Sequence, residues 1–151
     1  VREAAGDGPR ARAWVSIGRA LHRGAGVPVD QVASLRCWER ALDHELLLAR
    51  EVLSSAYLAG HGRPAADPVR AYAVAETGLP VEAMEPLDQP ALASCASNQG
   101  HALLADERLR SAAHLRLTCA RLRVAVERSA GQRRTNFELL LEQVAALAPT
   151  R

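Results

Sequence analysis

A pattern of apolar residues and paired glycines occurs twice near the start of this 151-residue chain, and it restricts the possible folds more than any other feature. In each copy an apolar residue recurs at every fourth position, followed by Gly-x-Gly, a Pro and an Asp. The matched pairs are Ala13 and Ala49, Ile17 and Leu53, Leu21 and Tyr57, Gly24 and Gly60, Gly26 and Gly62, and Asp30 and Asp67. The matched residues lie 36 or 37 positions apart, and a repeat of this length is typical of helix–turn–helix units that bury their apolar faces by stacking on one another.

The residues of each copy predict a first helix, a glycine turn and a second helix. The four-residue spacing of Ala13, Ile17 and Leu21 places them on one face of a helix, which we expect to be its core face. Gly24 is a candidate helix C-cap because glycine readily adopts a positive φ, and Asp30 is a candidate N-cap for the next helix. The equivalent second helices are predicted over residues 31–42 and 68–75.

The repeated residues resemble the Sel-one-like repeat, a tetratricopeptide-type unit, over about residues 11–78. The first copy reads AWVSIGRALHRGAGVPVDQVASLRCWERAL and the second reads AREVLSSAYLAGHGRPAADPVRAYAVAE. The chain departs from the family pattern at Leu21, which replaces a Tyr, and at Ser54 and Glu45, which replace glycines. The resemblance implies a TPR-like α–α solenoid of two helix pairs, and the function of a bacterial adaptor or scaffold that is often linked to the cell envelope.

Composition agrees with an all-α fold. Hydrophobic residues make up 48% of the chain and aromatic residues only 3%, so the apolar content is mostly the helix formers Ala and Leu. Three prolines over residues 79–90 predict an extended connection rather than a third repeat. We expect residues 91–151 to form helices that close the array, so that residues 1–151 are a single domain.

Two helices are predicted in this C-terminal segment. The first is a long helix from about residue 98 to 129, with Leu109, Ala113, Leu117, Ala120 and Val124 on its core face. The second begins with a capping box in which Thr135 is the N-cap and Glu138 bonds back to it. Its apolar face consists of Phe137, Leu140, Leu141, Val144 and Leu147.

No catalytic motif is present, and we predict no enzyme activity, no cofactor and no metal site. His44 is followed four residues later by Leu48, which cannot complete a zinc-binding helix. The cysteines, at positions 37, 95 and 119, lack metal-ligand spacing and are expected to be buried free thiols.

The predicted long helix and the residues after it are rich in arginine. The basic residues are Arg108, Arg110, Arg116, Arg121, Arg123, Arg128, Arg133 and Arg134. The net charge of the whole chain is only +2, and this stretch has no interleaved aromatic side chains to stack on bases. We therefore expect these arginines to form a solvated face whose charge is balanced by the acidic segment 76–88 of the same molecule. We do not expect nucleic acid as a partner.

The best candidate binding surface is the concave groove that the first helices of such units line. The candidate partner-binding residues are Arg12, Val15, Arg19 and His22 in the first copy, and Glu51 and Ser55, flanked by Leu48 and Leu58, in the second. A mixed strip of charged and aliphatic residues suits a peptide or a partner helix, so the predicted function is non-catalytic protein–protein binding. The alternative is a helical regulatory or secretion-chaperone-like bundle in which the two-copy pattern is incidental. No apolar run is long enough to span a membrane.

Overall fold

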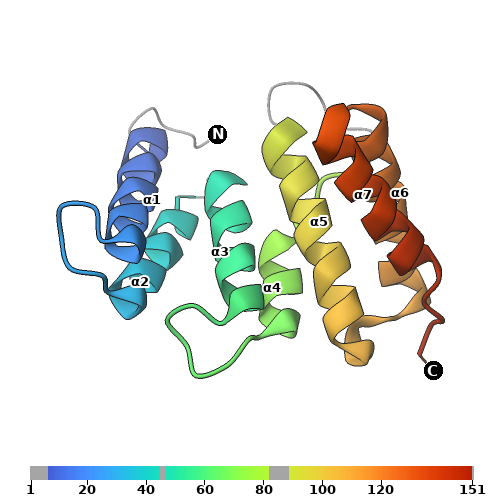
Figure 1. The fold of residues 1–151 in the computed structure, drawn as a ribbon, viewed down its shortest axis with the longest axis horizontal. Coiled ribbons are helices and arrows are strands. Elements are labelled where there is room, and N and C mark those ends of the chain that lie inside the picture. The colour runs from blue at the N-terminus through green and yellow to red at the C-terminus, as the bar shows by residue number, and fades with distance from the viewer. Residues whose placement is uncertain (1–6, 45–46, 82–88, 151) are drawn as a thin grey trace.

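The computed structural model describes residues 7–44, 47–81 and 89–150, and these residues form helices and no strands. The all-α prediction is confirmed for them. The helices are α1 (Asp7–Arg23), α2 (Gln31–Leu42), α3 (Leu47–Ala59), α4 (Pro68–Ala75), α5 (Gln89–Ala105), the 3-10 helix η2 (Glu107–Leu109), α6 (Ala112–Glu127) and α7 (Gly131–Ala145). They follow one another along the longest axis of the molecule, with α1 and α2 at one end and α6 and α7 at the other (Figure 1).

The turns after α1 and α3 have the same backbone geometry. Gly24 and Gly60 both have φ of 76°, and Gly26 and Gly62 have φ of 78° and 71°. These values lie in the left-handed region that only glycine adopts without strain. The predicted glycine turns are therefore confirmed in both copies.

The aspartates that follow these turns also act as predicted. Asp30 and Asp67 each accept a hydrogen bond at 3.0 Å from the amide three residues later, which caps α2 and α4. Their own amides donate to the carbonyls of Leu21 and Tyr57, at 2.9 and 2.8 Å respectively. Because both turns share these bonds, the second helices begin at the residues that the sequence predicts, and they also end at the predicted residues.

The predicted core face of α1 is wrong. Ile17 is 48% exposed, whereas Val15 is buried and its carbonyl accepts a hydrogen bond at 3.2 Å from the indole of Trp38. The same indole lies against Gly18, where a Cβ atom would collide with it. α1 is therefore turned so that Val15 and Gly18, rather than Ile17, face α2, because the large indole fits only over a glycine.

The predicted long helix over residues 98–129 is also wrong, because the chain breaks between α5 and α6. The Arg110 side chain donates to the carbonyls of Leu103 and Leu104, at 2.7 and 3.0 Å, and so satisfies the end of α5. Ser111 then caps α6 by accepting a bond at 3.1 Å from the amide of His114. No glycine or proline marks this break, since side chains complete the hydrogen bonds that the backbone leaves open.

The core face of α6 differs from the predicted one as a consequence. Ala113 is exposed, and Leu117, Ala120 and Val124 are only partly buried. The buried positions are Leu115, Thr118, Cys119, Arg121, Leu122 and Ala125. Because the chain breaks before α6, this helix turns a different face toward α5. The residues that flank the predicted stripe therefore lie at the centre of the buried face.

Helix α7 begins four residues before the predicted capping box, at Gly131. Thr135 lies inside the helix, where its hydroxyl donates to the carbonyl of Gly131 at 3.4 Å, so it is not the N-cap. The predicted apolar face is confirmed, because Phe137, Leu140 and Val144 are all buried. Helix α5 begins at Gln89, so the proline-rich connection ends before residue 90, and its residues 82–88 lie outside the described ranges.

The helices enclose two adjoining clusters of buried apolar side chains. One cluster joins α1 to α4 and contains Val15, Trp38 and Leu53, and the other extends from Tyr72 in α4 through α5 and α6 to α7. Leu58 packs against both clusters. This continuity agrees with a single domain, which remains a prediction.

The three cysteines are buried and free, as predicted. Burial raises the pKa of the Cys95 thiol to about 12, and it also raises the pKa values of Cys37 and Cys119. Because the thiolate is the reactive form, these side chains are inert at neutral pH.

Candidate functional site

A groove with a volume of about 540 Å³ lies between α3, α5 and α7. Its lining residues are Glu51, Ser55, Ser94, Ser97, Asn98, His101, Arg133, Asn136, Phe137, Leu139, Leu140 and Gln143. Two of the predicted partner-binding residues, Glu51 and Ser55, lie in it. Such a volume is in the range of pockets that bind small molecules or short peptide segments.

Glu51 is the central acidic group of this groove. Partial burial raises the pKa of its carboxyl, although a hydrogen bond with Ser94 and the positive charges of Arg133 and Arg19 act in the opposite direction. Because the pKa is raised on balance, the surroundings of Glu51 do not fully replace the water that its carboxylate has lost. A cationic group arriving in the groove would complete this compensation.

Asn98 joins the two helices that form the floor of the groove. Its side-chain amide donates to the Ser54 and Ser55 hydroxyls, at 2.7 and 3.1 Å, and to the carbonyl of Glu51 at 3.3 Å. These contacts hold α5 against the exposed side of α3. The backbone of α3 at Glu51 is therefore fixed against α5, and the Glu51 carboxylate accepts its hydrogen bond from Ser94 of that helix.

The wall that α7 contributes combines charge and apolar surface. Arg133 donates to the carbonyl of Pro90 at 3.0 Å and to the Ser94 hydroxyl at 3.3 Å, and its guanidinium lies over the Phe137 ring, 5.2 Å from the ring centroid. Leu139 is 55% exposed beside it. The groove thus offers hydrogen-bonding groups, a charged pair and an apolar edge to a ligand.

The other predicted partner-binding residues do not line this groove, although the charge of Arg19 acts on Glu51 from α1. Val15 is buried in the core, so it contacts no partner, and its assignment to the concave surface is wrong. Arg12 and Arg19 are exposed on α1, as predicted. His22 is partly buried, with its ring centroid 4.7 Å from that of His61. Val15 and His22 differ from the prediction because α1 is turned so that Val15 and Gly18, rather than Ile17, face α2.

Most lining residues of the groove were not identified from the sequence. Ser94, Ser97, Asn98 and His101 recur every three or four positions on α5, which is a polar stripe that periodicity alone could reveal. The predicted long helix began only at about residue 98, so the stripe was divided and not recognised. The contribution of α7 depends on how that helix packs.

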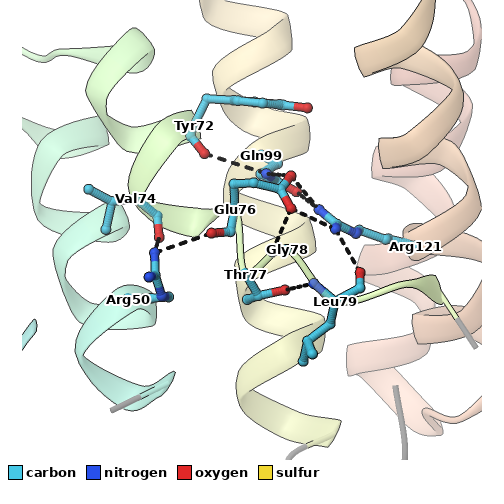
Figure 2. A network of polar contacts seen from close by, with 9 residues as sticks. All are labelled: Arg50, Tyr72, Val74, Glu76, Thr77, Gly78, Leu79, Gln99 and Arg121. Carbon is cyan, nitrogen blue, oxygen red and sulfur yellow. Dashed lines mark hydrogen bonds and ion pairs between the residues drawn. The ribbon is translucent and has the colours of Figure 1, made fainter. Parts of the chain in front are cut away.

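A second polar cluster lies on the other side of α5, and we call it the latch. It consists of Glu76 after α4, Gln99 in α5 and Arg121 in α6 (Figure 2). The Arg121 guanidinium donates to both carboxylate oxygens of Glu76, each at 2.8 Å, and to the side-chain oxygen of Gln99 at 2.9 Å. The latch connects the second helix pair with the C-terminal helices.

The latch also uses the backbone that leaves α4. Arg121 donates to the carbonyl of Leu79 at 3.0 Å, and the amide of Gly78 donates to Glu76 at 2.8 Å. On the opposite side Arg50 donates to the carbonyls of Val74 and Glu76 (Figure 2). Hydrogen bonds from Arg121 lower the pKa of Glu76 to about 2 against the effect of burial.

The latch explains part of the predicted basic face. Arg121 is 6% exposed and is paired within the molecule with Glu76, the first residue of the acidic segment, as expected. Arg108 forms a separate contact with Asp106 at 2.6 Å, and Arg116 and Arg123 lie exposed on α6. The arginines of this region therefore do not form one continuous strip.

In comparisons with known proteins, no family model matched this chain, and no curated protein or solved structure was significantly similar to it. The described residues contain no group of three or more side chains suited to a metal ion. Over the same ranges, no helix has the length and apolar character that crossing a membrane requires.

Proposed function

We propose that this protein is a non-catalytic protein-binding module, and that a segment of a partner protein binds in the groove between α3, α5 and α7. The observation that carries this proposal is the groove itself, in which the partly buried Glu51 carboxylate lies among amides, hydroxyls and apolar side chains. An extended peptide presents main-chain donors and acceptors along its whole length, which match such side chains.

The charges around the groove suggest the composition of the bound segment. A basic side chain of the partner pairs with Glu51, and an acidic one pairs with Arg19, whose charge acts on Glu51 from α1. Leu139, which is 55% exposed, contacts an apolar residue of the segment. The segment is therefore of mixed charge with at least one apolar anchor.

We further propose that α1–α4 are two TPR-like units of the Sel-one-like kind, closed by α5–α7. The shared turn geometry and the shared aspartate caps support this assignment. The order of the helices along the long axis (Figure 1) favours an array over the alternative, a regulatory or secretion-chaperone-like bundle. Small-angle X-ray scattering tests it, since an array gives an elongated particle and a closed bundle gives a compact one.

The binding proposal is tested by selecting peptides from a random display library on the immobilised protein. Selected peptides should carry a basic residue and an apolar residue, and their affinity should fall about tenfold or more for Glu51→Arg. The matched control is Arg116→Glu, a charge reversal on the exposed side of α6, which should leave affinity unchanged. In an NMR titration with a selected peptide, chemical shift changes outside the groove would contradict the proposal, as would an equal loss of affinity in both variants.

A further inference from the structure

Another groove, with a volume of about 440 Å³, lies between α6 and α7, at the end of the molecule away from α1 (Figure 1). We call it the C-terminal groove. Its apolar lining consists of Leu115, Cys119, Val144, Ala145 and Leu147, and its charged lining consists of Arg116 and Arg123. Among the described residues, none lines both this groove and the one that contains Glu51.

The two arginines lie on the same side of α6 as the apolar floor of the C-terminal groove. At about 100° per residue, Cys119 and both arginines fall within an arc of about 100° that begins at Leu115. Burial raises the pKa of the Cys119 thiol, and the positive charge of Arg123 acts in the opposite direction, so this charge reaches the floor. The positive charges therefore belong to the groove itself and not to another face of α6.

The charges of Arg116 and Arg123 are not balanced within the part of the chain that the structure describes. Neither side chain forms a hydrogen bond or an ion pair with a described residue. The arginines of the latch and of the groove that contains Glu51 differ in this respect, since both donate to side chains of the molecule. The carboxylates of α6 and α7 do not line the C-terminal groove; they are Glu127, Glu138 and Glu142. An acidic group from outside the described chain would therefore meet two unpaired guanidinium groups.

The described residues after α7 do not occupy the C-terminal groove. The amide of Thr150 donates to the carbonyl of Arg110 at 2.8 Å, and the Thr150 hydroxyl donates to the same carbonyl at 3.2 Å. These bonds hold the segment against the start of α6, where Leu147 contributes to the wall of the groove. The groove is thus formed by residues that are fixed by the fold.

The lining of the C-terminal groove favours a helix over an extended segment as its occupant. Apart from the two arginines it is apolar, so the main-chain amides and carbonyls of an extended segment would lie over it without partners, whereas a helix pairs its own. Arg116 and Arg123 are seven residues apart, which is about 10 Å along α6. Carboxylates at positions i and i+7 of a helix lying along α6 have the same spacing.

We propose that the C-terminal groove is a second docking surface, and that it binds an amphipathic helix of a partner protein whose apolar seam is bordered by carboxylates. Aliphatic side chains of that helix pack on Leu115, Cys119 and Leu147. Two carboxylates, one on each side of a seven-residue interval, pair with Arg116 and Arg123. This surface is separate from the groove that contains Glu51, and it selects a helix of a single charge sign.

Three peptides of equal length test this proposal against the full chain. All carry the same Leu and Ala seam; the first has Glu at the flanking positions, the second has Lys there, and the third is the Glu peptide with a central proline. In fluorescence anisotropy the Glu peptide should bind at least about tenfold more tightly than the Lys peptide, with an advantage that decreases as salt is added. The proline peptide cannot form a continuous helix and should also bind at least about tenfold more weakly than the Glu peptide.

Variants of the protein then locate the bound Glu peptide. Arg123→Glu should weaken its binding about tenfold, and the matched control Arg36→Glu, at an exposed arginine of α2, should have no effect. A second pair uses two neighbouring exposed alanines. Ala145→Gln places a longer side chain in the groove and should weaken binding about fivefold, whereas Ala146→Gln, outside the lining, should not.

Two further variants separate this surface from the groove that contains Glu51. Arg116→Glu should weaken binding of the Glu peptide about tenfold and leave peptides that bind beside Glu51 unaffected. Glu51→Arg should show the opposite pattern. Failure of one docking surface is therefore distinguishable from failure of the other.

The proposal is overturned if the Glu and Lys peptides bind equally, or if Arg123→Glu and Arg36→Glu lose binding equally, which would indicate general charge attraction. Equal binding of the proline peptide would show that the occupant is not a helix. Concentration-dependent association of the protein that Arg123→Glu abolishes, measured by light scattering, would identify a second copy as the occupant instead.

Discussion

Glu51 and Glu76 are two partly buried carboxylates near arginines, and their pKa values are shifted in opposite directions. Burial raises the pKa of Glu51, whereas hydrogen bonds from Arg121 lower the pKa of Glu76 to about 2. Arg121 contacts both oxygens of Glu76 at 2.8 Å. At Glu51, by contrast, the charges of Arg133 and Arg19 act through space.

The difference shows that direct bidentate contact, and not the mere presence of a nearby arginine, compensates a buried carboxylate. In the latch that compensation is complete within the chain, so the latch serves the fold. In the groove the effect of burial outweighs the charges of Arg133 and Arg19, so the pKa of Glu51 stays raised. The same residue types thus form a compensated ion pair on one side of α5 and part of the proposed binding groove on the other.

The largest expected effect comes from removing the latch together with the helices that contribute to it. Truncation after residue 90 deletes Gln99 and Arg121 and uncovers the apolar side of α4, where Tyr72 packs against α5 and its neighbours. We expect the remaining chain to aggregate or to melt without cooperativity in circular dichroism. A soluble monomer with a sharp transition would show two independent domains.

Breaking the latch with a single substitution should have the next largest effect. Arg121→Met leaves the Glu76 carboxylate without its partner, and we expect the free energy of unfolding to fall by about 3–5 kcal/mol. Urea denaturation measures this loss. Arg133→Met, the matched change in the groove, should cost no more than about 0.5 kcal/mol because Arg133 is exposed.

A second variant distinguishes the ion pair from the space that it fills. Arg121→Met combined with Glu76→Leu removes both charges, so it should recover part of the stability that Arg121→Met loses. A double variant that is less stable than the single one would mean that the hydrogen bonds to Gln99 and Leu79, rather than the pair with Glu76, carry the effect.

Acid titration should reveal the opposite signs of the two carboxylates. Because the folded-state pKa of Glu76 is depressed to about 2, its contribution is present above its unfolded pKa near 4.3 and is lost as pH falls toward 2. Allowing for its partial exposure, we expect this loss to be about 2 kcal/mol. Thermal melts at pH values from about 6 down to about 2 should show this loss of stability in the wild type and not in Glu76→Gln.

The smallest effect on stability is expected at Glu51. Its raised folded-state pKa means that the ionised form costs stability, and that this cost is relieved as pH falls and the carboxyl is protonated. Glu51→Gln should therefore be neutral or more stable than the wild type by no more than about 0.5 kcal/mol at pH 7. A clear loss of stability would place Glu51 in a compensated structural contact like that of Glu76.

The sequence predicted the local features of the first four helices well. Gly24, Gly60, Asp30 and Asp67 have the predicted conformations and caps, because each depends on hydrogen bonds within about ten residues of chain. The apolar face of α7 was also predicted from its spacing. Of the candidate site, Glu51 and Ser55 were identified, since the repeat register placed them opposite the core face of α3.

The features that were missed depend on contacts between distant parts of the chain. The break before α6 is completed by the Arg110 side chain, and the core face of α1 is decided by where Trp38 packs, neither of which periodicity can reveal. The Phe137 side of the groove exists because α7 packs near α5.

The sequence by itself therefore determined the helical class, the two repeated turns and their caps, because these are set by backbone conformation and short-range hydrogen bonds. Only the tertiary structure decided which carboxylate is compensated and which remains available. Glu51 and Glu76 have the same side chain, and their different pKa values arise from the arginines and the buried surfaces that folding brings to each of them.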